Sequence, residues 1–151
     1  MRTIMNTFES APLWRRLAAL LYDALVLVAI WMGAAALVLL AFRGEVDVAH
    51  QPPLYHFVLQ GVLLVLTALY FIVSWTRGGQ TIGMRAWRVS ILDAKGHFPD
   101  TRRSLARFLL ATGSALLLGV GFVWCLFDPD RRALHDILAR TRMVHLHKPD
   151  A

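Results

Sequence analysis

A single carboxylate, Asp23, interrupts an otherwise uncharged apolar stretch that runs from Leu17 to Phe42. A stretch of 26 residues is long enough to cross a hydrocarbon layer of about 30 Å as a helix. A carboxylate at that depth costs about 2.5–3.5 kcal/mol unless a partner or water compensates it. Arg16 lies seven positions earlier, only about 20° away around a helix, and therefore on the same face. We expect Arg16 and Asp23 to be coupled.

Two further apolar stretches, Phe57–Trp75 and Phe108–Phe127, contain no charged residue. Together with a hydrophobic content of 57%, they predict an integral membrane protein in contact with the lipid bilayer. The expected fold is all-α, with three apolar helices in one membrane domain over residues 13–147. Residues 1–12 and 148–151 are expected to be tails.

The distribution of Lys and Arg predicts the orientation of the chain. The segment between the second and third apolar stretches holds seven such residues, whereas the segment between the first two holds only Arg43. The positive-inside rule therefore places the N-terminus and the Arg77–Arg107 segment in the cytoplasm. The net charge of +6 is explained by this orientation, so we expect no binding of nucleic acid.

The third apolar stretch has two interpretations. Its 20 residues suffice for a third crossing, which is the interpretation that length favours. A crossing would place the basic C-terminal segment outside, against its charge. A re-entrant segment that dips into the membrane and returns avoids this conflict, and Gly113, Gly119 and Gly121 would permit the break. We expect the crossing, with re-entry as the alternative.

Two short segments alternate between apolar and polar residues. Trp87, Val89 and Ile91 alternate with Arg88 and Ser90, and an Asp93-Ala94-Lys95-Gly96 turn follows. A similar alternation occupies 142–147. The two segments predict a short β-hairpin, if both lie on one side of the membrane.

An amphipathic helix is predicted before the second of these segments. Asp128 followed by Pro129 is a favourable helix start. Ala133, Leu134, Ile137 and Leu138 would form an apolar stripe, which predicts a helix that lies in the membrane interface.

Three parts of the chain resemble the RDD family of small, mainly bacterial membrane proteins. They are Arg16 with Asp23, the sequence Gly79-Gln80-Thr81-Ile82-Gly83-Met84-Arg85, and Leu134-His135-Asp136-Ile137-Leu138. The resemblance covers about Leu13 to Leu146. It implies that Arg16, Asp23 and Asp136 are the arginine and two aspartates of the family's name. Met84 departs from the pattern, because members often have lysine there, and Arg85 follows it directly.

The resemblance implies a multi-pass protein of the bacterial inner membrane, and transport is the activity suspected for the family. Asp23 would then bind a proton or cation, or alternatively clamp one helix against another. Asp136 would pair with Arg132 and Arg140 on its own helix, or dock onto Arg16, Arg85 and Arg107. The leading hypothesis is a transport-related site of Arg16, Asp23 and Asp136, supported by Arg85, Arg107 and His135.

Other chemistry is not expected. His135 and Asp136 stand alone in the sequence, without the further ligands that a metal site needs. The chain has one cysteine, which excludes an internal disulfide. No serine or cysteine stands with a histidine and an acid as a nucleophile, so we predict no enzyme, metal or cofactor. Three helices rarely enclose a pathway, so transport would need a homo-oligomer or a larger membrane partner. The alternative function is a non-transporting membrane scaffold or assembly factor.

Overall fold

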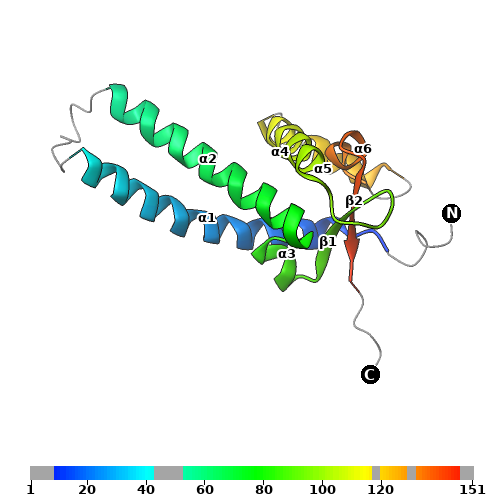
Figure 1. Cartoon of the computed structure of the whole chain (residues 1–151). Helices are drawn as coiled ribbons and strands as arrows, with labels where there is room; N and C mark the ends of the chain where they lie inside the picture. The colour runs from blue at the N-terminus through cyan, green and yellow to red at the C-terminus, as the bar shows by residue number, and fades with distance from the viewer. Residues whose placement is uncertain (1–8, 43–52, 117–119, 129–131, 147–151) are drawn as a thin grey trace.

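The computed structural model describes residues 9–42, 53–116, 120–128 and 132–146. Two long helices pack side by side, and the shorter elements gather at one of their ends (Figure 1). In chain order the elements are α1 (Leu13–Ala41), α2 (Pro53–Gly78), α3 (Ile82–Ala86), β1 (Val89–Asp93), α4 (Thr101–Leu116), α5 (Val120–Val123), the 3-10 helix η2 (Trp124–Leu126), α6 (Leu134–Leu138) and β2 (Thr141–His145).

The helices α1 and α2 are the two membrane-spanning candidates among the described residues. Both are long and apolar, and much of their apolar surface is exposed, as at Met32 (70%) and Phe57 (73%). A soluble protein would cover such a surface, whereas hydrocarbon solvates it. This arrangement is that of a membrane protein.

A two-stranded antiparallel sheet lies near the N-terminal end of α1. Strand β1 pairs with β2 in the register Val89 to His145 through Asp93 to Thr141. Val89 and Ile91 are buried on one face of the sheet. Val144 is buried on the other face, where it pairs with the buried Ser90, so both faces are covered and the alternation does not separate a core side from a solvent side. The two strands are not a local hairpin, because α4, α5 and α6 lie between them in the sequence.

The segment before α1 extends this sheet. The Ala11 amide donates to the Met143 carbonyl (3.0 Å), and the His145 amide donates to the Glu9 carbonyl (2.8 Å). Ala11 is fully buried. The boundary predicted at residue 13 is therefore too late, since residues 9–11 are part of the folded unit. Strands β1 and β2 and the segment before α1 thus lie at the same end of the long helices (Figure 1).

The third apolar stretch does not form the continuous helix that was expected over 108–127. Helix α4 begins earlier, at Thr101, and ends at Leu116. The chain then doubles back, because the Gly121 amide donates to the Ser114 hydroxyl at 2.9 Å. In a continuous helix these residues would be about 10 Å apart along the axis. A Cβ on Gly121 would lie 2.3 Å from that hydroxyl oxygen, so the close return requires glycine. A return of the chain at this point is what the re-entrant alternative requires, whereas a single straight crossing does not allow it.

The helix predicted from Asp128 is also shorter than expected, and its polar side is buried. It covers only Leu134–Leu138, and Pro129, the predicted start, lies outside the described residues. Its polar residues His135 and Asp136 are buried, whereas Leu134 and Leu138 are exposed. Two residues of the predicted stripe, Leu134 and Leu138, therefore face outward, whereas Ala133 is fully buried, Ile137 is partly buried and the charged side faces the protein.

Candidate functional site

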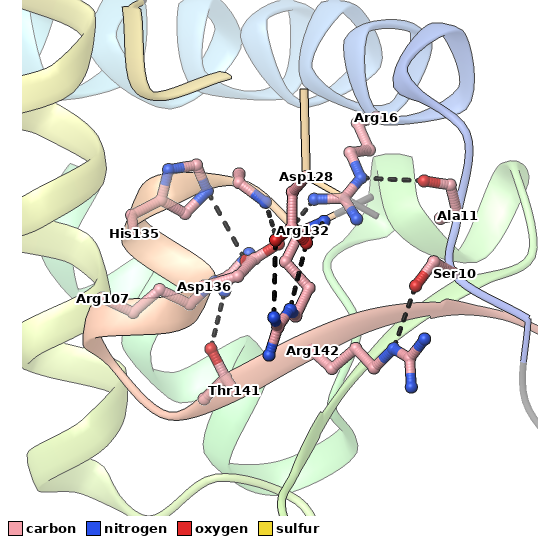
Figure 2. A network of polar contacts seen from close by, with 11 residues as sticks. Ser10, Ala11, Arg16, Arg107, Asp128, Arg132, His135, Asp136, Thr141 and Arg142 are labelled. Carbon is pink, nitrogen blue, oxygen red and sulfur yellow. Dashed lines mark hydrogen bonds and ion pairs between the residues drawn. The ribbon is translucent and has the colours of Figure 1, made fainter. Parts of the chain in front are cut away.

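Asp136 is the centre of a buried network of polar residues (Figure 2). Its carboxylate accepts a hydrogen bond from Nη1 of Arg16 at 2.5 Å and a very short one from Nη1 of Arg107. It also accepts from the Ala133 amide at 3.2 Å. Asp136 is 0% exposed, and both arginines are 2% exposed. Breaking a buried ion pair of this kind by removing one partner typically costs about 3–5 kcal/mol.

Each arginine of this network is bonded to a second element. The Arg16 Nε donates to the Ala11 carbonyl (2.9 Å), and the Arg107 Nη1 donates to the Thr141 hydroxyl (2.8 Å). Arg16 comes from α1, Arg107 from α4, Asp136 from α6 and Thr141 from β2. The network therefore connects the first membrane helix to the whole C-terminal part of the fold.

The charges in the network determine the protonation of its acidic and imidazole groups. Burial alone would raise the pKa of Asp136, but the guanidinium groups of Arg107 and Arg16 hold that pKa well below its usual range. Burial lowers the pKa of His135 to about 4, and the charge of Arg107 acts in the same direction. At neutral pH the network therefore contains an ionised carboxylate beside a neutral imidazole.

Asp23 belongs to a second, separate polar cluster. Its carboxylate accepts from the Tyr70 hydroxyl (2.6 Å), the Thr81 hydroxyl (2.6 Å) and the Gly83 amide (2.8 Å). Within the described part of the chain, no guanidinium bonds to it. The expected direct coupling between Arg16 and Asp23 is therefore wrong, although both residues lie on one face of α1 and both are buried.

The Asp23 cluster depends on a close approach between two helices. A Cβ on Gly83 would lie 2.1 Å from the Ala19 carbonyl oxygen and 2.9 Å from the Asp23 carboxylate. Only glycine lets the amide of residue 83 reach the carboxylate. Thr81 caps α3, and its hydroxyl accepts from the Met84 amide at 3.1 Å. Asp23 thereby fastens α1 to both α2 and α3.

The supporting residues lie in different places. Arg107 and His135 lie beside Asp136, whereas Arg85 is exposed and away from the network. Arg132, which was considered as a helical partner of Asp136, bonds instead to Asp128 at 3.1 Å. Asp136 therefore docks onto Arg16 and Arg107 rather than onto the arginines near it in sequence.

Three residues of these clusters were not assigned a role from the sequence: Tyr70, Thr81 and Thr141. Their hydroxyl groups are ordinary in composition, and only proximity in space gives them partners. The Thr81-Ile82-Gly83 turn is part of the motif that carries the resemblance, and it was the one available sign of the Asp23 site.

A cavity of about 270 Å³ lies beside both clusters. Its walls come from α1, α2 and α4, with single residues from α3, α6 and β2. Arg16, Asp23, Arg107 and His135 contribute to the lining, and most of the other lining residues are apolar. Met84, at the position where lysine was expected from the resemblance, is one of these apolar residues.

These features define a class of protein: a membrane protein with two long apolar helices and a compact unit locked onto one of their ends by buried ion pairs. The model of the RDD family matches residues 10–140, and the chain belongs to that family. No curated protein and no solved structure matches the chain.

Proposed function

We propose that the chain is a transport-related protein of the bacterial inner membrane, and that its ligand occupies the cavity beside the Arg16–Asp136–Arg107 network. The observation that supports this most is the combination of size and lining. The cavity of about 270 Å³ has charged residues at one part of its wall and apolar residues over the rest. Binding sites for small molecules are typically apolar with a few polar groups of this kind.

The orientation follows from the fold and the charge distribution. Strands β1 and β2 and the segment before α1 lie at one end of the molecule. The basic segment Arg77–Arg107 contains β1 and therefore reaches the same end. By the positive-inside rule this end lies in the cytoplasm, with the N-terminus. Two membrane helices do not enclose a pathway, so transport would take place in a homo-oligomer or with a larger membrane partner.

Asp23 has a different role in this proposal from a cation site. Three donors already occupy its carboxylate, and all three belong to the protein. Asp23 therefore acts as a clamp between helices, and the ligand is bound in the neighbouring cavity.

Proteoliposomes test the proposal with two probes: protons, followed by a trapped pH-sensitive dye, and a fluorescent lysophospholipid, followed by its accessibility to an impermeant quencher. The variant Ala111→Phe fills the cavity, because Ala111 lies in its wall. Leu109→Phe is the matched control, since Leu109 is 60% exposed and outside the lining. We expect movement of one probe in the wild type and the control, and its loss in Ala111→Phe. Movement of neither probe above that in empty liposomes would contradict transport.

The second candidate is a non-transporting scaffold or assembly factor. The observation that favours it is that both Asp23 and Asp136 are fully engaged in holding the fold. Asp23 holds the fold in both proposals, so the cavity variant Ala111→Phe separates them: a scaffold predicts unchanged recovery of a partner, whereas transport predicts lost flux at normal abundance.

A further inference from the structure

Two side chains of the wall of the cavity beside the ion-pair network carry buried hydrogen-bond donors that nothing in the described structure satisfies. The Nε of Arg107 and the Nε1 of Trp75 are buried and have no hydrogen-bond acceptor. Both side chains belong to the cavity wall. A buried donor without a partner is unfavourable, so native proteins rarely leave two together.

The two side chains that carry these donors are neighbours. The Arg107 guanidinium carbon lies 5.3 Å from the centroid of the Trp75 ring, as in a cation–π contact. Part of the hydrogen-bonding capacity of this guanidinium is already used, because its Nη1 donates to Asp136 and Thr141. A carboxylate or phosphate has several acceptor oxygens on one centre, so a single anionic group can serve two N–H donors that lie this close. Both donor atoms are buried in the present arrangement, so side chains around them must move before a head group can reach them.

Apart from Arg16, Asp23, Thr112 and His135, the rest of the cavity wall is apolar and fits a hydrocarbon chain. Ala19, Phe71, Met84 and Phe108 offer no strong hydrogen-bonding group from their side chains. The cavity has a volume of about 270 Å³. It can hold a compact head group and the first part of one chain, and it is too small for a lipid with two chains.

The cavity is open toward the apolar surface of the protein. Its wall includes the exposed residues Leu20 of α1 and Ala115 of α4. The residues next to this opening, such as Leu17 and Leu116, are also exposed and apolar. A ligand would therefore enter from the hydrocarbon layer, and the end of a longer chain would remain there.

We propose that this cavity binds a single-chain anionic amphiphile, with its carboxylate or phosphate head at the Nε groups of Arg107 and Trp75 and its chain directed toward the opening between Leu20 and Ala115. The inference rests on the proposed function only in using the same cavity. Binding is measured at equilibrium without flux, so the two can fail independently.

The test uses the full-length protein in nanodiscs, with protein-free nanodiscs as the blank. Three probes with the same chain length are compared: palmitate, hexadecyl phosphate and hexadecyltrimethylammonium. We expect saturable binding of palmitate or hexadecyl phosphate, and the tighter of these two identifies the preferred head. The cationic probe should show no binding beyond the blank, because it offers no acceptor to the donors.

Two variants locate the site. Trp75→Phe keeps the aromatic ring but removes one donor, and we expect about tenfold weaker binding of the anionic probe. Ala111→Phe should abolish binding by filling the cavity, while Leu109→Phe on the same helix should bind as the wild type does. Equal binding of the cationic and anionic probes by the wild type would overturn the proposal, and so would unchanged binding by Ala111→Phe.

Discussion

Arg16 and Asp136 are 120 positions apart in the sequence, yet their side chains meet at 2.5 Å in a buried ion pair. Arg16 lies in the first turn of α1 and Asp136 lies in α6, near the end of the chain. The pair therefore fixes the C-terminal part of the fold to the first membrane helix.

A double-mutant cycle tests this pair. Arg16→Gln and Asp136→Asn should each destabilise the protein by roughly 3–5 kcal/mol, because each leaves a buried charge without its partner. The double variant should lose much less than the sum of the two losses. Circular dichroism during unfolding in detergent gives the free energy of unfolding of each single variant and of the double variant relative to the wild type.

The corresponding cycle with Asp23 serves as the control for the first. Asp23 bonds to Tyr70, Thr81 and Gly83 rather than to Arg16. The loss of unfolding free energy in the double variant should therefore equal the sum of the losses from Arg16→Gln and Asp23→Asn, to within about 0.5 kcal/mol. Strong non-additivity here would contradict the separation of the two clusters.

Gly83→Ala should strongly destabilise the packing of α3 on α1. The added methyl carbon would lie 2.1 Å from the Ala19 carbonyl oxygen, and backbone must move to relieve that contact. Gly61→Ala in α2 is the matched control, because nothing lies within 4 Å of its added carbon. The control should unfold at the same temperature as the wild type or higher, since alanine favours a helix over glycine by about 1 kcal/mol. Equal unfolding temperatures for Gly83→Ala and the wild type would refute the close contact.

Stability should fall as the pH drops from about 6.5 toward 4. Burial lowers the pKa of His135 to about 4 in the folded protein, whereas an unfolded histidine titrates near 6.5. In this window the unfolded state binds more protons, so the free energy of unfolding decreases with decreasing pH, by up to about 3 kcal/mol. Above pH 6.5 His135 is neutral in both states and contributes no pH dependence. Unfolding midpoints from pH 4 to 8 for the wild type and His135→Gln check this, and the variant should lose most of the slope.

The turn after β1 and the C-terminus should lie on the same side of the membrane as the N-terminus. This follows because β1, β2 and the segment before α1 form one unit. In a Cys125→Ser background, a cysteine introduced at Lys95 should resist an impermeant reagent in intact cells and react after lysis. A reporter fused after Ala151 should behave as a cytoplasmic one, and labelling of residue 95 in intact cells would contradict this orientation.

Periodicity and charge were sufficient to predict several parts of the fold from the sequence. The two long helices follow from apolar length, and the strands around Val89 and Val144 follow from alternation. The meeting of Asp136 with Arg16 and Arg107 was among the alternatives considered, and the structure selects it over pairing with Arg132 and Arg140.

Other features could not be predicted, because they depend on distances between segments remote in sequence. Same-face spacing suggested Arg16 for Asp23, but the hydroxyls of Tyr70 and Thr81 lie closer once α2 and α3 pack against α1. Length favoured a third crossing, and the contact between Gly121 and Ser114 reverses the chain instead. The charged side of α6 is buried because Asp136 pairs with Arg16 and Arg107, and the sequence pattern of α6 alone contains no sign of these partners.

The separation of Arg16 from Asp136 also sets an order of events during biosynthesis. At about 5–20 residues per second, the ribosome needs roughly 6 to 24 seconds after making Arg16 before it makes its carboxylate partner. During that delay α1 carries a cation whose final partner does not yet exist. The long arginine side chain can extend to the aqueous boundary in the meantime. The ion pair between the first helix and α6 can therefore form only after the segment that carries Asp136 has been made.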